Sequence, residues 1–382
     1  MMKNLSLLFC TILNIGVLAE EPKALPTEAA IKMAETVIAE TALEKDQQPT
    51  RYNYWMYQNY IIAEGIKNMG DALGRPEFSE YKEKQLMYFC DSYKKITDTR
   101  SQNHYLKPNS LWHSGMVASF VEAQATSNHP EIARGISYFQ GMLNRAPKIT
   151  DGTHTRYKPR WKSKGVQIDD LYMLVPYWVR KSKQSGNPKY LEKAIEETLN
   201  YNKYLWNPQT KLMHCLWLEK KPEAKIHHWG RGNGWFVMAI TDLLNFVPEN
   251  HPKRAELLKI YNNVMLGLMA RQNKDGLWHQ VLNRPESYTE TSCSGMFTYS
   301  LLLGSNKGWL PSSARTAGIK GWNGLQTKLT DKNQLKDVCV GTDMSEKVQY
   351  FFTRPRVTHD QHGIGPFLLA AAEIIKLKSN KL

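Results

Sequence analysis

The chain has 382 residues, of which 42% are hydrophobic, and it contains 11 Trp, 19 Tyr and 11 Phe. This is enough apolar material for a large core, and beyond the first residues no apolar run is long enough to span a membrane. The formal net charge of +14 indicates an acidic partner, such as nucleic acid, anionic lipid or an acidic polysaccharide.

The N-terminus has the features of a secretory signal peptide. Lys3 gives it a positive start, residues 5–18 are apolar, and Ala19 ends a plausible cleavage site before Glu20. The alternative is a buried N-terminal helix. We predict a signal peptide at 1–19 and export, to a periplasm. Because no Pro/Gly/Ser-rich linker or charge block divides the rest of the chain, we predict one domain over 20–382.

Four cysteines remain after cleavage, namely Cys90, Cys215, Cys293 and Cys339. Their spacings are wide and include no C-x-x-C pair, so a zinc site is not expected. A disulfide is possible in an oxidising compartment. In a chain of this size, buried free thiols are the stronger expectation.

Helical periodicity dominates the chain and predicts an all-α fold. The twelve predicted helices lie near 26–44, 53–69, 78–95, 112–126, 129–146, 168–184, 188–204, 231–247, 251–271, 291–305, 311–329 and 361–379. Short strands are predicted within the weakly repeated segments 212–217, 277–282 and 335–340. Helix pairs joined by short β-hairpins on one rim predict a toroid of six helical hairpins.

A run of alternating basic residues precedes the sixth predicted helix; it comprises Arg156, Lys158, Arg160, Lys162 and Lys164. In an extended segment all five side chains would point to one face. We interpret the run as a basic surface for an anionic substrate. A solvated loop is the alternative.

Two adjacent carboxylates, Asp169 and Asp170, begin that helix. A helix N-terminus favours negative charge, so simple capping explains either residue. We assign capping to Asp170 more readily than to Asp169, which we keep as a candidate for acid–base chemistry.

The segment 228–235 combines three glycines with a cation, an amide and two tryptophans. Arg231 offers a planar fork suited to a carboxylate, and the faces of Trp229 and Trp235 suit the apolar face of a sugar ring. Asn233 adds an amide. The segment is not a dinucleotide fingerprint, because no strand precedes it and no third glycine has the right spacing. The alternative is a glycine-rich helix start whose tryptophans belong to the core.

The histidines do not form a metal-binding pattern. His214 lies on one of the predicted hairpins, and the pair at 359 and 362 has no third ligand in view. No metal or other cofactor is therefore expected.

Taken together, six motifs resemble those of glycoside hydrolase family 105, the unsaturated rhamnogalacturonyl hydrolases, and more distantly family 88, the unsaturated glucuronyl hydrolases. The motifs are WMYQ at 55–58, DDLYM at 169–173, WGRGNGW at 229–235, QNKDGLW at 272–278, YTETS at 288–292 and HGIGP at 362–366. The resemblance covers most of the mature chain. It implies an (alpha/alpha)six barrel, in agreement with the twelve predicted helices.

The resemblance also implies an activity. Such enzymes remove a 4,5-unsaturated uronic acid from the non-reducing end of oligosaccharides left by polysaccharide lyases, by hydrating the enol ether. The first aspartate of the Asp-x-Leu-Tyr-Met motif, Asp169 here, would protonate C4 and assist water attack at C5. The residues expected to bind substrate are Tyr57, His113, Tyr172, His214, Trp229, Arg231, Asn233 and Trp235.

Two positions depart from the family pattern. His113 stands where the family often has an aspartate, and Gln167 stands where a tryptophan is common. Together with the basic charge, these departures favour a sulfated, ulvan-type oligosaccharide over pectin fragments, which remain open. The expected partner is an anionic oligosaccharide, with neither nucleic acid nor membrane; the oligomeric state is not predicted.

Two further functions remain open. An ordinary inverting glycosidase on the same barrel would need a second carboxylate roughly 6.5–9.5 Å from Asp169. A non-catalytic protein that binds acidic glycans is the other alternative. Nucleic-acid binding is the weakest reading, because no basic helix or known motif is present.

Overall fold

The computed structural model describes residues 26–99, 111 and 116–379. The predicted signal peptide at 1–19 and the predicted site residue His113 lie outside these ranges, so both stay predictions.

The described chain is mostly helical, and every predicted helix has a counterpart. The helices are α1 (Glu28–Glu40), α2 (Tyr57–Leu73), α3 (Pro76–Thr99), α4 (Val117–Ala123), α5 (Pro130–Arg145), α6 (Asp170–Ser185), α7 (Lys189–Leu205), α8 (Gly230–Phe246), α9 (Arg254–Met269), α10 (Thr291–Asn306), α11 (Ser312–Gln326), α12 (Val348–Phe352) and α13 (Gln361–Ser379). The short α12 was not predicted, because five residues carry too little periodicity. Among the described residues, no helix has both the length and the apolar character needed to cross a membrane.

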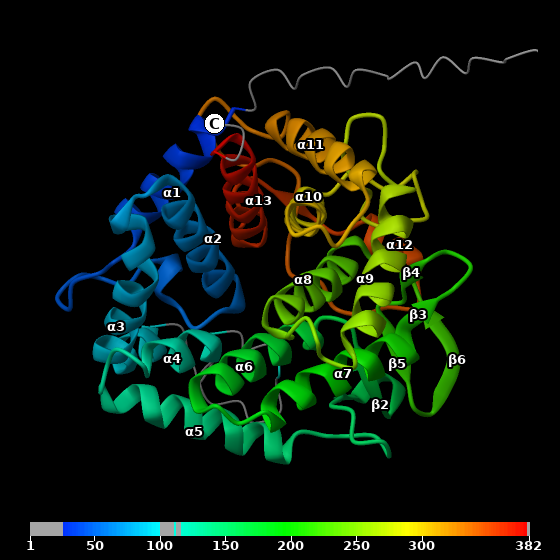
Figure 1. The fold of residues 1–382 in the computed structure, drawn as a ribbon, viewed down its shortest axis with the longest axis horizontal. Coiled ribbons are helices and arrows are strands. Elements are labelled where there is room, and N and C mark those ends of the chain that lie inside the picture. The colour runs from blue at the N-terminus through cyan, green and yellow to red at the C-terminus, as the bar shows by residue number, and fades with distance from the viewer. Residues whose placement is uncertain (1–25, 100–110, 112–115, 380–382) are drawn as a thin grey trace, which may run out of the picture.

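The helices form a closed ring of hairpins (Figure 1). The inner ring consists of α2, α4, α6, α8, α10 and α13, and each of these helices pairs with one outer helix, respectively α3, α5, α7, α9, α11 and α1. The expected all-α barrel of six helical hairpins is confirmed.

The sequence of each helix matches its place in the ring. The inner helix α8 is buried almost continuously from Gly230 to Leu244, as expected for a helix that is apolar on every side. The outer helix α7 buries a single stripe, with Ala194, Thr198 and Tyr201 at helical spacing. An inner helix such as α8 can therefore direct side chains toward the centre of the ring.

The ring closes where α2 packs against α13. Glycine permits this close approach: a β-carbon on Gly365 would lie 2.6 Å from Ile61 Cγ2 and 2.7 Å from the carbonyl carbon of Ile61. The first and last helices also share one hydrophobic cluster, in which Trp322 stacks on Phe367 at 5.0 Å between ring centroids.

Short strands lie on one rim and lead into the inner helices. An antiparallel sheet has the order β1 (Arg156–Lys158), β2 (Ser163–Gln167), β5 (Leu216–Leu218) and β6 (Lys221–Ile226). Two further ribbons pair β3 (Trp206–Asn207) with β4 (Leu212–Met213), and β7 (Val338–Cys339) with β8 (Arg356–Val357). Of the three predicted strand segments, 277–282 forms only isolated bridges.

The alternating basic run does not form one extended face, so that prediction is wrong. A 3-10 turn at Pro159–Trp161 separates β1 from β2, and Lys162 has a left-handed backbone with φ 46°. Arg156 and Lys158 are turned inward, whereas Arg160 and Lys162 are exposed. Proline cannot continue the ladder, which is why the chain bends there.

The four described cysteines are all buried and unpaired. The expectation of free thiols is confirmed for this part of the chain.

Candidate active site

A pocket of about 450 Å³ opens on the rim where the N-terminal ends of α2, α6 and α8 converge. Its lining residues are Met56, Tyr57, Gln58, Arg156, Gln167, Asp169, Met173, Trp229, Arg231, Trp235, Gly341, Thr342 and Asp343. Helix N-termini carry partial positive charge and favour bound anions. The pocket is thus suited to a negatively charged ligand.

Asp169 reaches this pocket from the end of β2. The strand pairs with β5 up to Gln167, and the Ile168 amide then donates to the carbonyl of Cys215 at 3.1 Å, which places Asp169 at the start of α6. Its Oδ2 accepts a hydrogen bond from Gln167 Nε2 at 2.7 Å, while its Oδ1 is buried and has no partner among the described residues. Burial raises the pKa of Asp169 to about 6.

The neighbouring Asp170 is an ion-pair partner rather than a simple cap. Its carboxylate is fully buried and accepts hydrogen bonds from Arg156 Nε at 2.8 Å to each oxygen. Asp170 is in the first turn of α6, as expected of a helix-start carboxylate, and the ion pair with Arg156 is a second role that the sequence did not predict. Arg156 comes from β1, so this pair fastens the rim sheet to the start of α6.

Arg231 lines the pocket and also holds one of its walls. Its Nη1 donates to the carbonyl of Cys339 at 2.6 Å, and its Nη2 donates to the carbonyl of Val340 at 2.8 Å. Its guanidinium carbon lies 5.1 Å from the centre of the Trp229 ring. The cation is thus fixed beside the pocket by the last residue of β7 and by the residue after it.

Three pocket residues keep buried polar atoms without a hydrogen-bond partner among the described residues. These atoms are Gln58 Oε1, Asp169 Oδ1 and Trp229 Nε1. Buried polar groups are normally paired, so each such atom calls for an explanation. Three of them in one pocket indicate a place where a polar ligand or water completes the hydrogen bonds.

Of the predicted site residues, Tyr57, Asp169, Trp229, Arg231 and Trp235 meet in the pocket, whereas Tyr172, His214 and Asn233 do not line it. Tyr172 packs behind Trp235, with 5.4 Å between the ring centroids.

Asn233 and His214 lie behind the pocket lining and support it. Asn233 accepts from the Met213 amide at 2.8 Å and donates to the Met213 and Trp229 carbonyls, each at 3.0 Å. His214 stacks on His228 at 4.4 Å.

Sequence reasoning missed several lining residues, above all Gln58, Met173 and Asp343. Gln58 and Met173 lie inside recognised motifs, so their neighbours Tyr57 and Asp169 pointed to them. No motif marks the loop that carries Asp343, whose side chain is 83% exposed at the pocket. It is a second carboxylate at this site.

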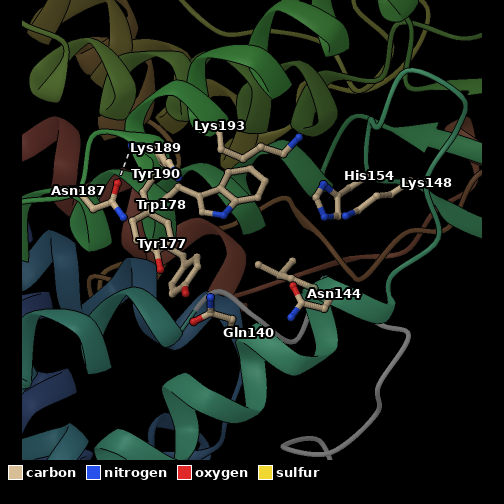
Figure 2. Close-up of a pocket in the computed structure, with 11 residues that line it drawn as sticks. Gln140, Asn144, Lys148, His154, Tyr177, Trp178, Asn187, Lys189, Tyr190 and Lys193 are labelled. Atoms are coloured by element: carbon tan, nitrogen blue, oxygen red, sulfur yellow. Dashed lines mark hydrogen bonds between the residues drawn. The ribbon is translucent and has the colours of Figure 1, made fainter. Parts of the chain in front are cut away.

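A second pocket, of about 340 Å³, lies between α5 and α7 against Tyr177 and Trp178 of α6 (Figure 2). His154 on its wall is paired with the buried carboxylate of Glu197. Among the described residues that line this pocket there is no carboxylate. Of the two pockets, the one that contains Asp169 is therefore the one with carboxylates in its lining.

Known proteins resemble this chain over most of its length. A family model described as Glycosyl Hydrolase Family 88 matches residues 30–378. A structure described as a possible member of the GH105 family from Salmonella enterica serovar Paratyphi A superposes with a TM-score of 0.79 and covers 97% of this chain and 100% of that chain. At 17% sequence identity, this likeness shows the shared fold alone.

Two curated relatives match about half of the chain or somewhat more. An "Unsaturated 3S-rhamnoglycuronyl hydrolase" from Alteromonas sp. (strain LOR) is 29% identical over 217 residues, which are 54% of this chain and 50% of that protein. An "Unsaturated rhamnogalacturonyl hydrolase" from Bacillus subtilis (strain 168) is 23% identical over 244 residues, or 62% of this chain and 68% of that protein. The match thus spans only half the length of the Alteromonas relative.

Proposed function

Because the chain belongs to glycosyl hydrolase family 88, we propose that it is an unsaturated uronyl hydrolase. The motif resemblance to families 105 and 88 is confirmed by this match and by the shared fold. The proposed reaction removes a 4,5-unsaturated uronic acid from the non-reducing end of an oligosaccharide. The names of the two curated relatives support this class of substrate.

The observation that carries the proposal is the burial of Asp169, which favours its protonated form. A general acid must be protonated when the substrate arrives, and an ordinary aspartate is ionised at neutral pH. Burial raises the pKa of Asp169 to about 6, so a useful fraction of the residue keeps its proton. Its second oxygen, Oδ1, is buried at the pocket and unpartnered.

In the proposed reaction, protonated Asp169 donates to C4 of the enol ether. The positive charge that develops at C5 is then quenched by water, and the resulting hemiketal collapses to release the shortened oligosaccharide. We assign the uronate carboxylate to Arg231, because the guanidinium is held beside the pocket by backbone carbonyls. Trp229 and Trp235 supply apolar faces for the sugar ring.

The proposed substrates are ulvan-type oligosaccharides, in which the uronic acid precedes a sulfated rhamnose, with pectin fragments as the second choice. The net charge of +14 favours a multiply charged substrate. The relative from Alteromonas carries the 3S-rhamnoglycuronyl name, and the relative from Bacillus subtilis carries the rhamnogalacturonyl name.

The test is to incubate the purified protein with lyase-treated ulvan and lyase-treated pectin, each in a separate assay. Hydration destroys the conjugated enol ether, so its ultraviolet absorbance should fall while a shortened oligosaccharide appears. The faster substrate identifies the source. Persistent absorbance with both substrates would reject the proposed reaction.

Asp343 supports one alternative, an ordinary inverting glycosidase. Such an enzyme needs a second carboxylate across the pocket from its general acid, and Asp343 lines the same pocket as Asp169. In that case the unsaturated sugar is released intact. The enol-ether absorbance then does not fall, although shorter oligosaccharides accumulate. A non-catalytic glycan binder neither lowers the absorbance nor produces shorter oligosaccharides.

We also propose that the protein is exported and that residues 1–19 are removed, on the strength of the charged and apolar N-terminal sequence. N-terminal sequencing of the native protein decides this, since a protein that begins at Met1 contradicts the proposal.

A further inference from the structure

Tyr57 is the first member of a chain of hydrogen bonds that leads away from the pocket. Its Oη lies 2.6 Å from His362 Nε2, and His362 Nδ1 lies 2.5 Å from Asp360 Oδ1. Asp360 also accepts from the backbone amide of His362 at 2.9 Å. Tyr57 belongs to α2 and His362 to α13, so the chain crosses the seam where the ring closes (Figure 1).

The surroundings fix where the protons lie. Burial opposes ionisation of Asp360, but its hydrogen bond from His362 prevails and lowers its pKa, so Asp360 is a carboxylate and His362 carries its proton on Nδ1. Burial, together with the charge of Arg231, lowers the pKa of His362, so its Nε2 is an unprotonated acceptor. Gln58 Nε2, 3.1 Å from His362 Nε2, fits the same assignment as a second donor.

The Tyr57 hydroxyl therefore donates to His362 and leaves its own oxygen lone pairs for a donor in the pocket. Burial raises the pKa of Tyr57, so the residue stays a neutral phenol. Such a phenol passes a proton on rather than storing it: it can accept one from a ligand only as it gives its own to the imidazole.

The charges around the two residues act on the transfer in both directions. Arg231 of α8 disfavours imidazolium at His362, whereas Asp360 and Glu290, the residue before α10, favour it. Around Tyr57, the carboxylates Asp169 and Asp360 oppose phenolate, and the cations Arg231 and Arg156 favour it. Asp360 thus provides the counter-charge that imidazolium needs.

We propose that Tyr57, His362 and Asp360 form a proton relay that removes the proton of the water attacking C5, while Asp169 protonates C4. This inference rests on the proposed function. As the water oxygen bonds to C5, its proton moves to Tyr57 Oη, and the Tyr57 proton moves to His362 Nε2. Asp169 ends the step as a carboxylate and His362 as imidazolium beside Asp360, so the proton count is unchanged. Proton return from His362 resets the site.

In this scheme Tyr57 is the catalytic residue, because it lines the pocket, and His362 and Asp360 are positioning residues that act through it. The relay separates the proton donor from the proton acceptor. The two proton transfers can then proceed together, and Asp169 does not have to serve as acid and base in the same step.

The relay is tested with Tyr57→Phe, His362→Gln, Asp360→Asn and the double variant Tyr57→Phe/His362→Gln. The matched control is His359→Asn, which replaces a neighbouring buried histidine whose ring makes no hydrogen bond to Tyr57 and whose φ of 60° asparagine tolerates. We expect kcat to fall at least about tenfold in each single relay variant, with little change in KM for His362→Gln and Asp360→Asn. The control should retain the activity of the wild type.

Two readouts separate a relay from mere support of the fold. The double variant should lose no more activity than Tyr57→Phe alone, because the residues act as one unit; multiplied losses would overturn the relay. In Asp360→Asn, the pKa of His362 should fall further, so the acid limb of the kcat profile should move to lower pH. An unmoved limb would also overturn it.

The outcomes also distinguish the relay from the proposed function. If the wild-type protein leaves the enol ether of both substrates intact, the proposed function fails and the relay fails with it. If the wild type is active but His362→Gln matches the His359→Asn control, the relay alone is rejected.

Discussion

Asp169 has neighbours that shift its pKa in opposite directions. Burial and, more weakly, the charge of Asp170 raise it. The lowering influences are the charge of Arg156, the hydrogen bond from Gln167 and the charge of Lys158. The resulting value of about 6 keeps both the acid and the carboxylate accessible near neutral pH. A residue that must give up and regain a proton in each turnover benefits from this balance.

Asp169→Asn keeps the size of the side chain but cannot cycle a proton. We expect kcat to fall by at least about a hundredfold, with substrate binding retained, because general acid–base catalysis contributes on that scale. The loss of enol-ether absorbance measures kcat, and calorimetric titration of the inactive variant measures binding. Asp343→Asn is the matched control and should remain active; a comparable loss in that variant favours the inverting glycosidase.

The wild-type rate should fall as pH rises through about 6. The acid must be protonated, so the value of kcat/KM follows the fraction of Asp169 that keeps its proton, and the basic limb reports its pKa in the free enzyme. A profile of kcat/KM between pH 4.5 and pH 8 checks this. A flat profile over that range contradicts the assignment of Asp169 as the donor.

The same shift makes Asp169 a cost to stability above pH 6. Its folded pKa is raised, so the unfolded chain ionises more easily, and the wild type loses free energy of unfolding as pH rises through the folded value. Asp169→Asn removes the penalty and should be more stable than the wild type at pH 8, by on the order of 1 kcal/mol because Asp169 is partly exposed. Urea unfolding of both proteins at pH 4.5 and pH 8 measures the difference, which should be clearly smaller at pH 4.5, because the penalty builds up between the unfolded pKa near 3.9 and the folded value of about 6.

At the residue scale, the chemical role of a side chain could be predicted from the sequence better than the direction in which the side chain points. Asp169 and Arg231 stand in motifs whose residue types already suggest a proton donor and a carboxylate binder. The roles of Asn233 and His214 depend on which wall of the pocket each side chain supports, and spacing along one helix does not specify the strand behind it. Asp343 came as a surprise because its loop joins the pocket only through the tertiary fold.

The rim hairpin shows why elements with short sequences are harder to predict than helices. A helix repeats its apolar stripe over many turns, so all twelve predicted helices were found. The alternation from Arg156 to Lys164 satisfied a strand pattern, yet Pro159 breaks it after three residues. The two halves then pair with each other, and the basic side chains separate into an inward and an outward set.

Reversal of the outward charges should therefore matter little. In Lys162→Glu/Lys164→Glu we expect KM to change less than about twofold at low and at high salt, because exposed charges act weakly. Lys162 is exposed, and Lys164 Nζ donates to the carbonyl of Lys148 at 2.7 Å. Lys158→Met provides the contrast, because this buried lysine lowers the pKa of Asp169, and its loss should move the basic limb to higher pH. A salt-dependent rise in KM for the double reversal would instead support the interpretation of these lysines as a basic surface for the substrate.

On the scale of the whole molecule, the packing of α2 against α13 holds the ring shut. In Gly365→Ala, the new methyl group meets the backbone of Ile61 at 2.7 Å, and backbone cannot rotate away as a side chain can. We expect a loss of about 1–3 kcal/mol in the free energy of unfolding. Urea denaturation measures it against Gly341→Ala, where the added methyl group has no atom within 4 Å. Equal stability of the two variants would mean that the seam has room to relax.

The ring can close only late in translation, because it joins a helix near the N-terminus to the last helix of the described chain. Tyr57 and His362 are 305 positions apart, so at ribosomal rates of about 5–20 residues per second the tyrosine waits roughly 15–60 s for its histidine. During that interval the inner face of α2 has no α13 to cover it, and the nascent chain presents apolar side chains such as Ile62 and Ile66. That surface of α2 therefore stays uncovered until the final helix has been translated, and only then can the contact between Tyr57 and His362 form.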